Sequence, residues 1–440
     1  MLESSYAPIW NGNIGDRIDR KSFAFVKRFE RELLKRKSRI YHQSPNKSYI
    51  KKIQLSSQFY FNLLKDINIY SDFRSIPTTN RKDFSSSIAS IVPIDQNLDS
   101  LIINPTSGTT GEPILAPNHP SAIGCYVPLI EFSLNQHGVK LTKSPESTIA
   151  IQLCYQKQTL VYATSHSLSG GARFAKINID DSAWIDPNHK QLFIDSMMPE
   201  ILTGDPYAFE GAMKMGIQYK PKAIHSTALE LTDSLRFKLL EYFQCPIINF
   251  YSLNETGPIA YSCPLHPEWM HILPHDIFVE TLDEKGNPTN KNEYGEITIT
   301  GGRNPYLPLI RYRTGDFGIL NTDPCNCSDP FPRLKLLSGR KPVYFNLKSG
   351  ETINPIDLAR ILRRFPDIYQ FQIVQKSLEK FEINISCSND LTLELRNKII
   401  TELRIILVGD IQIELKDQFP LDGKKNRMFV NEWVEKENLL

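Results

Sequence analysis

A segment rich in glycine and hydroxyl residues, NPTSGTTGEP at residues 104–113, contains the residue types that bind phosphate. Its centre, Ser107 to Gly111, has two glycines and three hydroxyl side chains. Backbone amides and hydroxyls in such a loop can surround phosphate oxygens. The segment differs from a Walker A sequence, because no Lys-Ser or Lys-Thr pair follows its second glycine. A plain surface loop is the alternative interpretation.

A second segment, NFYSLNETG at residues 249–257, has the pattern of a buried strand that runs into a turn. Tyr251 at the end of the strand can stack on a nucleotide base. Glu255, four residues later, can hold a magnesium ion that bridges phosphates, because Mg²⁺ prefers oxygen ligands. The alternative is a turn that is simply capped by its own polar residues.

Two more segments offer groups for the rest of a nucleotide. RYRTGD at residues 311–316 places Asp316 in a tight turn, where its carboxylate can accept hydrogen bonds from both hydroxyls of a ribose. An aspartate that only caps the turn is the alternative. GKKNR at residues 423–427 offers a cation that can reach negative charge developing on a carboxyl group and a phosphate.

Four residues have the spacing of a zinc site. Cys325 and Cys327 are separated by one residue, and Cys263 and His271 lie about 60 positions earlier. Three thiolates and an imidazole can form a tetrahedral Cys₃His site, which we interpret as structural because four protein ligands leave no position for water. His266 competes with His271 as the fourth ligand, and ordinary loop cysteines are the alternative.

The elements that must position these groups follow an α/β pattern from residue 100 to 320. Strands are predicted at 147–154, 158–164, 246–251 and 295–300, and helices at 206–216 and 232–243, with Thr232 as the N-cap of the second. This alternation favours a large body with mostly parallel sheets and helices. A further helix is predicted at 21–37 from apolar residues spaced along one face.

The sequence changes character after Ser338. The last 100 residues or so have their own helices, at 355–365 and 391–408, and strands at 381–387 and 410–415, enough for a small α+β domain. We therefore predict a large N-terminal domain at 1–338 and a small C-terminal domain at 339–440.

Composition excludes several classes of protein. The formal net charge of the 440-residue chain is only +2, which argues against a nucleic-acid binder. No apolar stretch approaches the ~20 residues of a transmembrane helix, and the first residues lack the pattern of a signal peptide. Seven cysteines, an odd number, do not suggest a disulfide framework. We expect a cytoplasmic protein that contacts neither nucleic acid nor membrane.

Taken in order, TSGTTGEP, YSLNETG, YRTGD, the Gly339-Arg340 pair and GK..R resemble the motifs of the adenylate-forming superfamily of acyl-CoA synthetases, adenylation domains and luciferases. Nearly the whole chain resembles the phenylacetate–CoA ligase branch, including IPTT at 76–79 with Lys82-Asp83. The resemblance implies that ATP and a carboxylic acid, preferably an aryl or arylacetic acid, form an acyl-adenylate with Mg²⁺. A thiol then displaces AMP. That thiol is coenzyme A or, as the alternative, a carrier protein's phosphopantetheine, and an amine is a third acceptor.

The resemblance also implies a role for individual residues. Ser107, Gly108, Thr109, Thr110 and Gly111 should wrap the β- and γ-phosphates. Tyr251 should stack on adenine beside a wall of Ser226, Thr227 and Ala228, while Asp316 holds the ribose, and Arg340 and Arg333 approach the ribose or the α-phosphate. Glu255 should hold magnesium, and Lys424, with Lys425 as an alternative, should contact the reacting carboxylate. The acyl pocket should lie near Tyr126, Ser169, Gly170, Gly171 and Tyr251.

The chain departs from the family after Gly339-Arg340, where an acidic pair and a basic residue are usual. It has Lys341 and Pro342 there, and the proline ring fixes φ near −65°. We expect Pro342 to restrict rotation of the small domain before thiol transfer. A non-catalytic nucleotide-binding scaffold is a rival from another class, although Lys424, Glu255 and Asp316 argue against it. A carrier protein and a second copy of the chain stay open as partners beside the small carboxylic acid.

Overall fold

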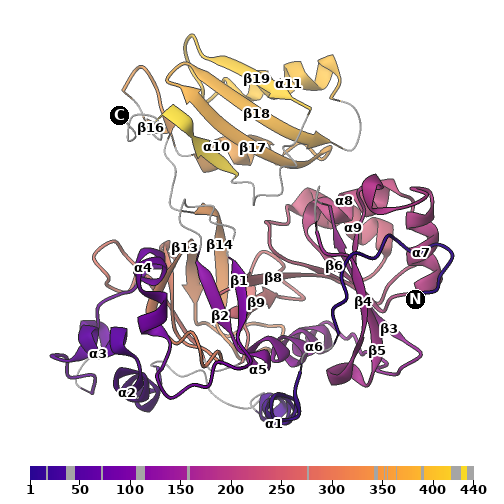
Figure 1. The fold of residues 1–440 in the computed structure, drawn as a ribbon. Helices are drawn as coiled ribbons and strands as arrows, with labels where there is room; N and C mark the ends of the chain where they lie inside the picture. The colour runs from indigo at the N-terminus through magenta and orange to yellow at the C-terminus, as the bar shows by residue number, and fades with distance from the viewer. Residues whose placement is uncertain are drawn as a thin grey trace.

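A computed structural model describes residues 1–15, 18–35, 45–70, 73–105, 114–155, 159–274, 277–340, 345–350, 352–353, 355–362, 364–387, 391–417 and 428–433. Figure 1 shows a large body and, above it, a smaller orange and yellow body formed by the C-terminal elements. The large body is built on a 12-stranded sheet, and the small one on a four-stranded sheet. The α/β class and the small α+β C-terminal domain are as predicted.

The large sheet has the strand order β11-β12-β13-β14-β10-β9-β8-β7-β6-β3-β5-β4. Its strands are β3 (Thr148–Cys154), β4 (Tyr162–His166), β5 (Ala172–Asn178), β6 (Ile201–Gly204), β7 (Ala223–Ser226), β8 (Ile247–Leu253), β9 (Gly257–Ser262), β10 (Met270–Ile272), β11 (Ile277–Leu282), β12 (Gly295–Gly301), β13 (Leu309–Asn321) and β14 (Arg333–Arg340).

The expectation of mostly parallel strands describes only one half of this sheet. β5, β3, β6, β7 and β8 pair in parallel, whereas β8 to β14 and the edge strand β4 pair antiparallel. Parallel neighbours need a crossover, which α7 (His189–Met197), α8 (Pro206–Lys214) and α9 (Asp233–Phe243) supply or accompany. The antiparallel half arises because short connections return the chain directly.

The N-terminal third supplies the remaining elements of the large body. They are α1 (Arg20–Lys35), α2 (Lys47–Ser56), α3 (Gln58–Leu64), α4 (Arg81–Ile91), the hairpin of β1 (Ile102–Pro105) and β2 (Leu115–Asn118), α5 (Pro120–Gly124) and α6 (Tyr126–Gln136). Helix α6 packs Leu129 and Phe132 on one face of the parallel strands, in a core that includes Ile201 and Ala223. The opposite face is covered by α8 and α9 through a second core. The phosphate-loop segment connects β1 to β2.

The small domain has its own hydrophobic core, which runs in sequence from Phe345 to Phe429. Its elements are β15 (Phe345–Asn346), β16 (Thr352–Ile353), α10 (Pro355–Leu362), β17 (Ile368–Ser377), β18 (Lys380–Cys387), α11 (Leu393–Leu403), β19 (Gln412–Lys416) and β20 (Phe429–Asn431). The boundary at residues 338 and 339 stays a prediction. Pro342 lies outside the described residues.

Among the described residues, the hydroxyls of Ser386 and Ser234 form hydrogen bonds between the small domain and the large body. The Ser386 hydroxyl on β18 donates to both carboxylate oxygens of Glu210 on α8, at 2.7 and 2.8 Å. The Ser234 hydroxyl at the start of α9 donates to the carbonyl of Pro366 at 2.7 Å. Among the described helices, none is long and apolar enough to cross a membrane.

Candidate active site and candidate metal centre

Tyr251 and Asp316, predicted from separate motifs, meet where β8 and β13 come together. The Tyr251 hydroxyl donates a hydrogen bond to Asp316 Oδ2 at 3.0 Å, and its side chain is buried. Burial, reinforced by the nearby Asp316 carboxylate, raises the pKa of Tyr251 well above its usual value. The phenol therefore keeps its proton and stays a donor to this carboxylate.

The backbone around Asp316 is held in a bulge by groups that sequence reasoning did not identify. Gly315 has φ of +78°, and the pairing of β13 with β14 shifts register between Asp316 and Gly318. Glu296 on β12 accepts the Gly315 N–H at 3.1 Å and a bond from Arg313 Nη1 at 2.6 Å. Glu296 lies in the strand predicted at 295–300, but the sequence did not indicate that its side chain contacts Gly315 and Arg313.

Glu255 lies in the turn after β8 and is buried. The Tyr312 hydroxyl donates to its Oε1 at 3.1 Å, and Arg81 Nη1 lies 4.0 Å from the same oxygen. A buried carboxylate is a suitable ligand for Mg²⁺, which binds oxygen donors. Tyr312 lies within the RYRTGD motif, and Arg81 directly precedes Lys82-Asp83. Their positions in or beside these motifs were the only sequence features that could have indicated a contact with Glu255.

The predicted adenine wall lies beside Tyr251. Ser226 ends β7, and the Thr227 hydroxyl is 3.2 Å from the hydroxyl of Ser252, the residue after Tyr251. Ala228 has φ of +74°, a left-handed conformation that is uncommon for a residue with a side chain. This turn brings residues 226–228 to the carboxyl-terminal edge of the parallel strands, where β8 also ends.

Tyr126, predicted to border the acyl group, begins α6 next to the same edge. A Cβ added to Gly257, which has φ of +72°, would collide with the Tyr126 ring. The ring therefore packs directly on the backbone that follows Glu255. Burial raises the pKa of the Tyr126 hydroxyl, so it stays a neutral donor.

Ser169, Gly170 and Gly171 are not brought to this edge, which corrects their assignment to the acyl pocket. They connect β4 to the start of β5, and β5 runs parallel to β3, so they precede the strand and lie at the amino-terminal edge. Ser169 bonds His166 Nδ1 at 3.1 Å instead. The motif alone does not reveal at which end of the strand these residues lie.

The two arginines assigned near the nucleotide lie at opposite ends of β14. Arg340 is the Cα partner of Asp316, whereas Arg333 pairs with Asn321 at the far end of β13. The Arg333 guanidinium lies over the Trp269 ring at 5.4 Å and donates to Cys325 Sγ at 3.5 Å. The structure thus separates Arg333 from the nucleotide residues, which corrects its assignment, and it places the backbone of Arg340 beside Asp316.

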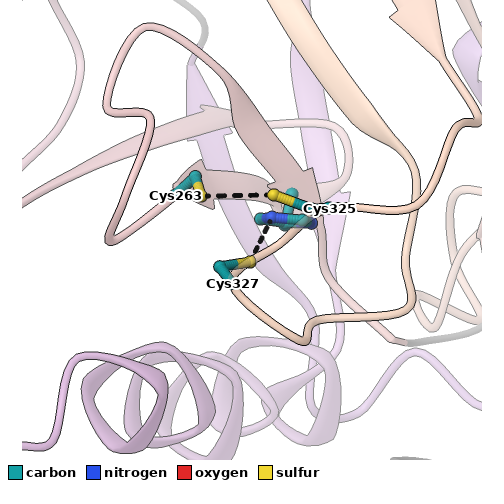
Figure 2. A group of neighbouring side chains, drawn as sticks. Cys263, Cys325 and Cys327 are labelled. Atoms are coloured by element: carbon teal, nitrogen blue, oxygen red, sulfur yellow. Dashed lines mark hydrogen bonds between the residues drawn. The ribbon is translucent and has the colours of Figure 1, made fainter.

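Cys263, His271, Cys325 and Cys327 converge at the end of the sheet opposite Glu255, with all four ligand atoms within 4.8 Å of one another. Figure 2 shows Cys263, which follows β9, facing Cys325 and Cys327 in the connection from β13 to β14. The Sγ atoms of Cys263 and Cys325 are 3.8 Å apart. A tetrahedral zinc ion with ~2.3 Å bonds to sulfur separates two thiolates by about 3.8 Å, so the donor set fits this metal.

The surrounding groups orient the four side chains. His271 is fully buried, and its Nδ1 lies 2.9 Å from the carbonyl of Phe331, which leaves Nε2 directed at Cys327 Sγ, 3.1 Å away. A ring nitrogen fixed by a backbone carbonyl is the usual second contact of a metal-binding histidine. His266, the competing ligand, is turned away and bonds Asn326 at 2.8 Å.

Several predicted residues cannot be placed. Ser107 to Gly111, Lys424 and Lys425 all lie outside the described residues, although β1 and β2 fix both ends of the connection that contains the first group. Of the residues predicted to contact the nucleotide, the structure brings together Tyr251, Glu255, Asp316, residues 226–228 and the backbone of Arg340.

Several known proteins resemble this chain in sequence or in fold. A phenylacetate-coenzyme A ligase from Thermus thermophilus is 21% identical over 314 residues, 68% of this chain and 68% of that protein. Protein CapK from Staphylococcus aureus is 22% identical over 407 residues, 87% of this chain and 83% of that protein. A 2-hydroxyisobutyryl-CoA ligase in its postadenylation state has a similar fold, with a TM-score of 0.67 at 14% identity over 94% of this chain and 91% of that one. No protein-family model matches the chain.

The chain is thus similar in sequence to AMP-forming ligases and in fold to a solved acyl-CoA ligase. Two of the proteins similar to it over most of its length are phenylacetate-coenzyme A ligases, and a third is CapK.

Proposed function

We propose that the chain activates a carboxylic acid with ATP to form an acyl-adenylate and pyrophosphate, and that it then transfers the acyl group to a thiol. The observation that supports this most directly is the meeting of Tyr251, Asp316 and Glu255 at one strand edge, beside the turn of residues 226–228. Adenine, ribose and phosphate groups are then met by three motifs that are far apart in the sequence.

In this proposal each residue has a limited task. Tyr251 and the turn of residues 226–228 hold the adenine, and the Asp316 carboxylate accepts hydrogen bonds from the ribose hydroxyls. The carboxylate of the acid attacks the α-phosphorus in line with the departing pyrophosphate, so the protein must bring two anions together. Lys424 contacts both anions and neutralises the charge that develops between them. Ser107 to Gly111 bind the β- and γ-phosphates.

Two metals belong to the proposal. Glu255 would hold Mg²⁺, which neutralises phosphate charge when it is bound. Cys263, His271, Cys325 and Cys327 would hold one structural zinc, as their spacing of sulfur and nitrogen atoms supports. The zinc ligands lie at the other end of the sheet, so this metal would take no part in the chemical step.

Coenzyme A is the proposed acceptor, and an aryl or arylacetic acid the proposed substrate. Both are inferred from proteins of similar sequence, two of which are phenylacetate-coenzyme A ligases.

The test is pyrophosphate release by the purified chain with ATP, Mg²⁺ and a panel of carboxylic acids, with and without coenzyme A. We expect acid-dependent release, and thioester formation once coenzyme A is added. Lack of release with every acid, while ATP still binds, would favour the non-catalytic scaffold. Release without thioester would instead point to a carrier protein or an amine as the acceptor.

Lys424→Ala should lower acyl-adenylate formation by about 10²–10³-fold, because it removes charge stabilisation at the reacting centre. The variant should still fold and bind ATP, since Tyr251, Asp316 and Glu255 remain. Lys425→Ala is the matched control and should change the rate little. A reversed pattern would assign the role to Lys425, and full activity in both variants would refute a catalytic cation in this segment.

A further inference from the structure

A row of polar side chains crosses the parallel strands near their carboxyl-terminal ends. Gln152 on β3, Thr203 on β6 and His225 on β7 are successive Cα partners, and Lys176 on β5 pairs with Gln152 on the other side. Side chains alternate between the faces of a strand. Residues two positions earlier on these strands, Ala150, Ile201 and Ala223, share a core with α6, so the row faces the α6 side of the sheet.

His225 is the most deeply buried member of the row, with 8% of its surface exposed. Its Nδ1 lies 2.7 Å from the Thr203 hydroxyl, and its ring meets Phe250 edge-on at 4.3 Å. The other ring nitrogen, Nε2, is buried and has no hydrogen-bond partner among the described residues. Buried polar atoms without a partner are rare because leaving one unsatisfied is costly, so Nε2 is a candidate contact for a ligand.

Lys176 and Gln152 extend the row and are half-buried. Within the described part of the chain, no acidic group lies at ion-pair distance from the Lys176 ammonium group. The side-chain amide of Gln152 has no hydrogen-bond partner among the same residues. An ammonium group carries three N–H donors and a side-chain amide carries two. Partly removing such donors from water is unfavourable unless an acceptor replaces the water. The row therefore presents donors that match an oxygen atom of a ligand.

The row adjoins the proposed nucleotide site. His225 directly precedes the turn of residues 226–228, and the carbonyl of Gly204, next to Thr203, accepts the Thr227 N–H at 3.0 Å. An acyl group joined to the α-phosphate could extend from that turn along the α6 face. Ser169 to Gly171 lie at the amino-terminal edge of these strands, at the end opposite the row.

We infer that Lys176, Gln152, Thr203 and His225 bind the acyl part of the substrate, and that the acid carries an oxygen substituent such as a hydroxyl, a carbonyl or a second carboxylate. The inference rests on the proposed adenylation. It narrows the proposed substrates to acids with an oxygen substituent and excludes an unsubstituted arylacetate. An apolar acyl group would leave these donors without acceptors.

The test compares matched acids in the pyrophosphate-release assay: phenylacetate with 4-hydroxyphenylacetate, benzoate with 4-hydroxybenzoate, and butyrate with 4-hydroxybutyrate and succinate. We expect at least one oxygen-bearing acid to exceed its unsubstituted partner in kcat/KM by about tenfold or more, as one satisfied hydrogen bond allows. Equal use of both members of every active pair would overturn the inference and leave adenylation intact. Failure of all acids would overturn adenylation and the inference with it.

Two variants link the preference to the row. Lys176→Met removes the charge but keeps the length of the side chain, and Thr203→Val removes the hydroxyl in a side chain of the same shape. Each should lower the ratio of kcat/KM between matched acids about tenfold, because the oxygen-bearing acid loses a contact that its unsubstituted partner never makes. A selective loss with succinate in Lys176→Met would identify a carboxylate as the substituent, and a loss with the hydroxy acids would identify a hydroxyl.

Lys140→Met, at an exposed position away from the row, is the matched control and should leave the ratio unchanged. Unchanged ratios in both row variants, with melting temperatures like that of the natural chain, would refute the role of the row. A fall in activity with all acids alike would show a merely structural role and would refute it as well.

Discussion

Single charged residues inside the RYRTGD motif show that most of its polar groups build structure. Arg311 is buried, with Nε donating to Glu280 at 3.1 Å and Nη1 to the carbonyl of Ile76 at 2.6 Å. The Arg311 backbone has φ of +45°, which is uncommon for a residue with a side chain. The side-chain hydrogen bonds help to hold the backbone in this conformation. Arg313 bonds Glu296 in the same way. Asp316 differs from these arginines, because its carboxylate accepts a hydrogen bond from Tyr251 at the predicted nucleotide site.

His225 should make folding pH-dependent. Burial lowers its pKa from 6.5 to about 4, so between these values the unfolded chain binds a proton that the folded chain does not. Stability is therefore complete above pH 6.5 and falls as the pH drops towards 4. At pH 4.5 the loss is about 2 kcal/mol. In His225→Asn, the fall in the free energy of unfolding between pH 7 and pH 4.5, measured by urea titration, should be smaller by that amount. An equal fall in both proteins would contradict the lowered pKa.

At the scale of elements, the connections at the far end of the sheet depend on the cysteine cluster. The β9–β10 turn supplies Cys263, β10 supplies His271, and the long connection from β13 to β14 supplies the two other cysteines. Asp329 in that connection lies 3.8 Å from His271 Nδ1 and also accepts a bond from the buried Tyr261 hydroxyl. A metal would therefore tie two segments that the sheet pairs only through short ladders.

We expect one zinc per chain in protein purified without added metal. A metal that joins positions 263 and 325 closes a loop of roughly 60 residues as a disulfide would, and such cross-links contribute about 2–4 kcal/mol. Cys327→Ser should lose the zinc and about this much unfolding free energy, with little effect on pyrophosphate release at low temperature. His266→Ala is the control and should keep the metal. Well under one equivalent of zinc in the natural protein would refute the site.

Local signals in the sequence were sufficient for the helices and strands that we predicted, with errors mainly at their ends. Thr232 caps α9 through a bond from the Leu235 N–H at 3.2 Å, as predicted. The strand predicted at 158–164 begins only at Tyr162, because Asn11 from the distant N-terminus takes the Val161 N–H at 2.7 Å. The helix predicted to reach 408 ends at Leu403, where the chain tightens into turns before Gly409, with φ of +98°.

The site was predictable where motifs carried it and not where partners are remote. Tyr251, Glu255 and Asp316 were found from their motifs, and the cysteine cluster was found from spacing. Glu296 and Thr203 were missed because their contacts are set by strand register, which one sequence does not show. Arg333 was misplaced for a related reason: eight residues of β14 separate its two ends, and the motif did not reveal which end faces Asp316.

At the scale of the whole molecule, the contact between the two domains is polar. The small-domain sheet packs one face on its own helices and core, whereas the other face carries Gln370, Gln372, Asn384 and Ser386, which alternate along β17 and β18. Gln370 and Gln372 are buried against neighbouring structure. We predict that the small domain can leave and return, because the described contacts from Ser386 and Ser234 to the large body are hydrogen bonds that water can replace.

The bond from Ser386 to Glu210 is the point at which this contact can be tested. Glu210 is buried on α8 and also pairs with Lys214 at 3.0 Å, so a second carboxylate opposite it would be repelled. Ser386→Asp should release the small domain, which would raise the radius of gyration in X-ray scattering. Because Lys424 belongs to that domain in the proposed reaction, adenylate formation should also slow, by about tenfold or more. Ser386→Ala removes only the hydrogen bonds. Its radius of gyration and its rate of adenylate formation should lie between those of Ser386→Asp and those of the natural chain. The same radius and the same rate in Ser386→Asp would show that the Glu210 contact does not hold the domains together.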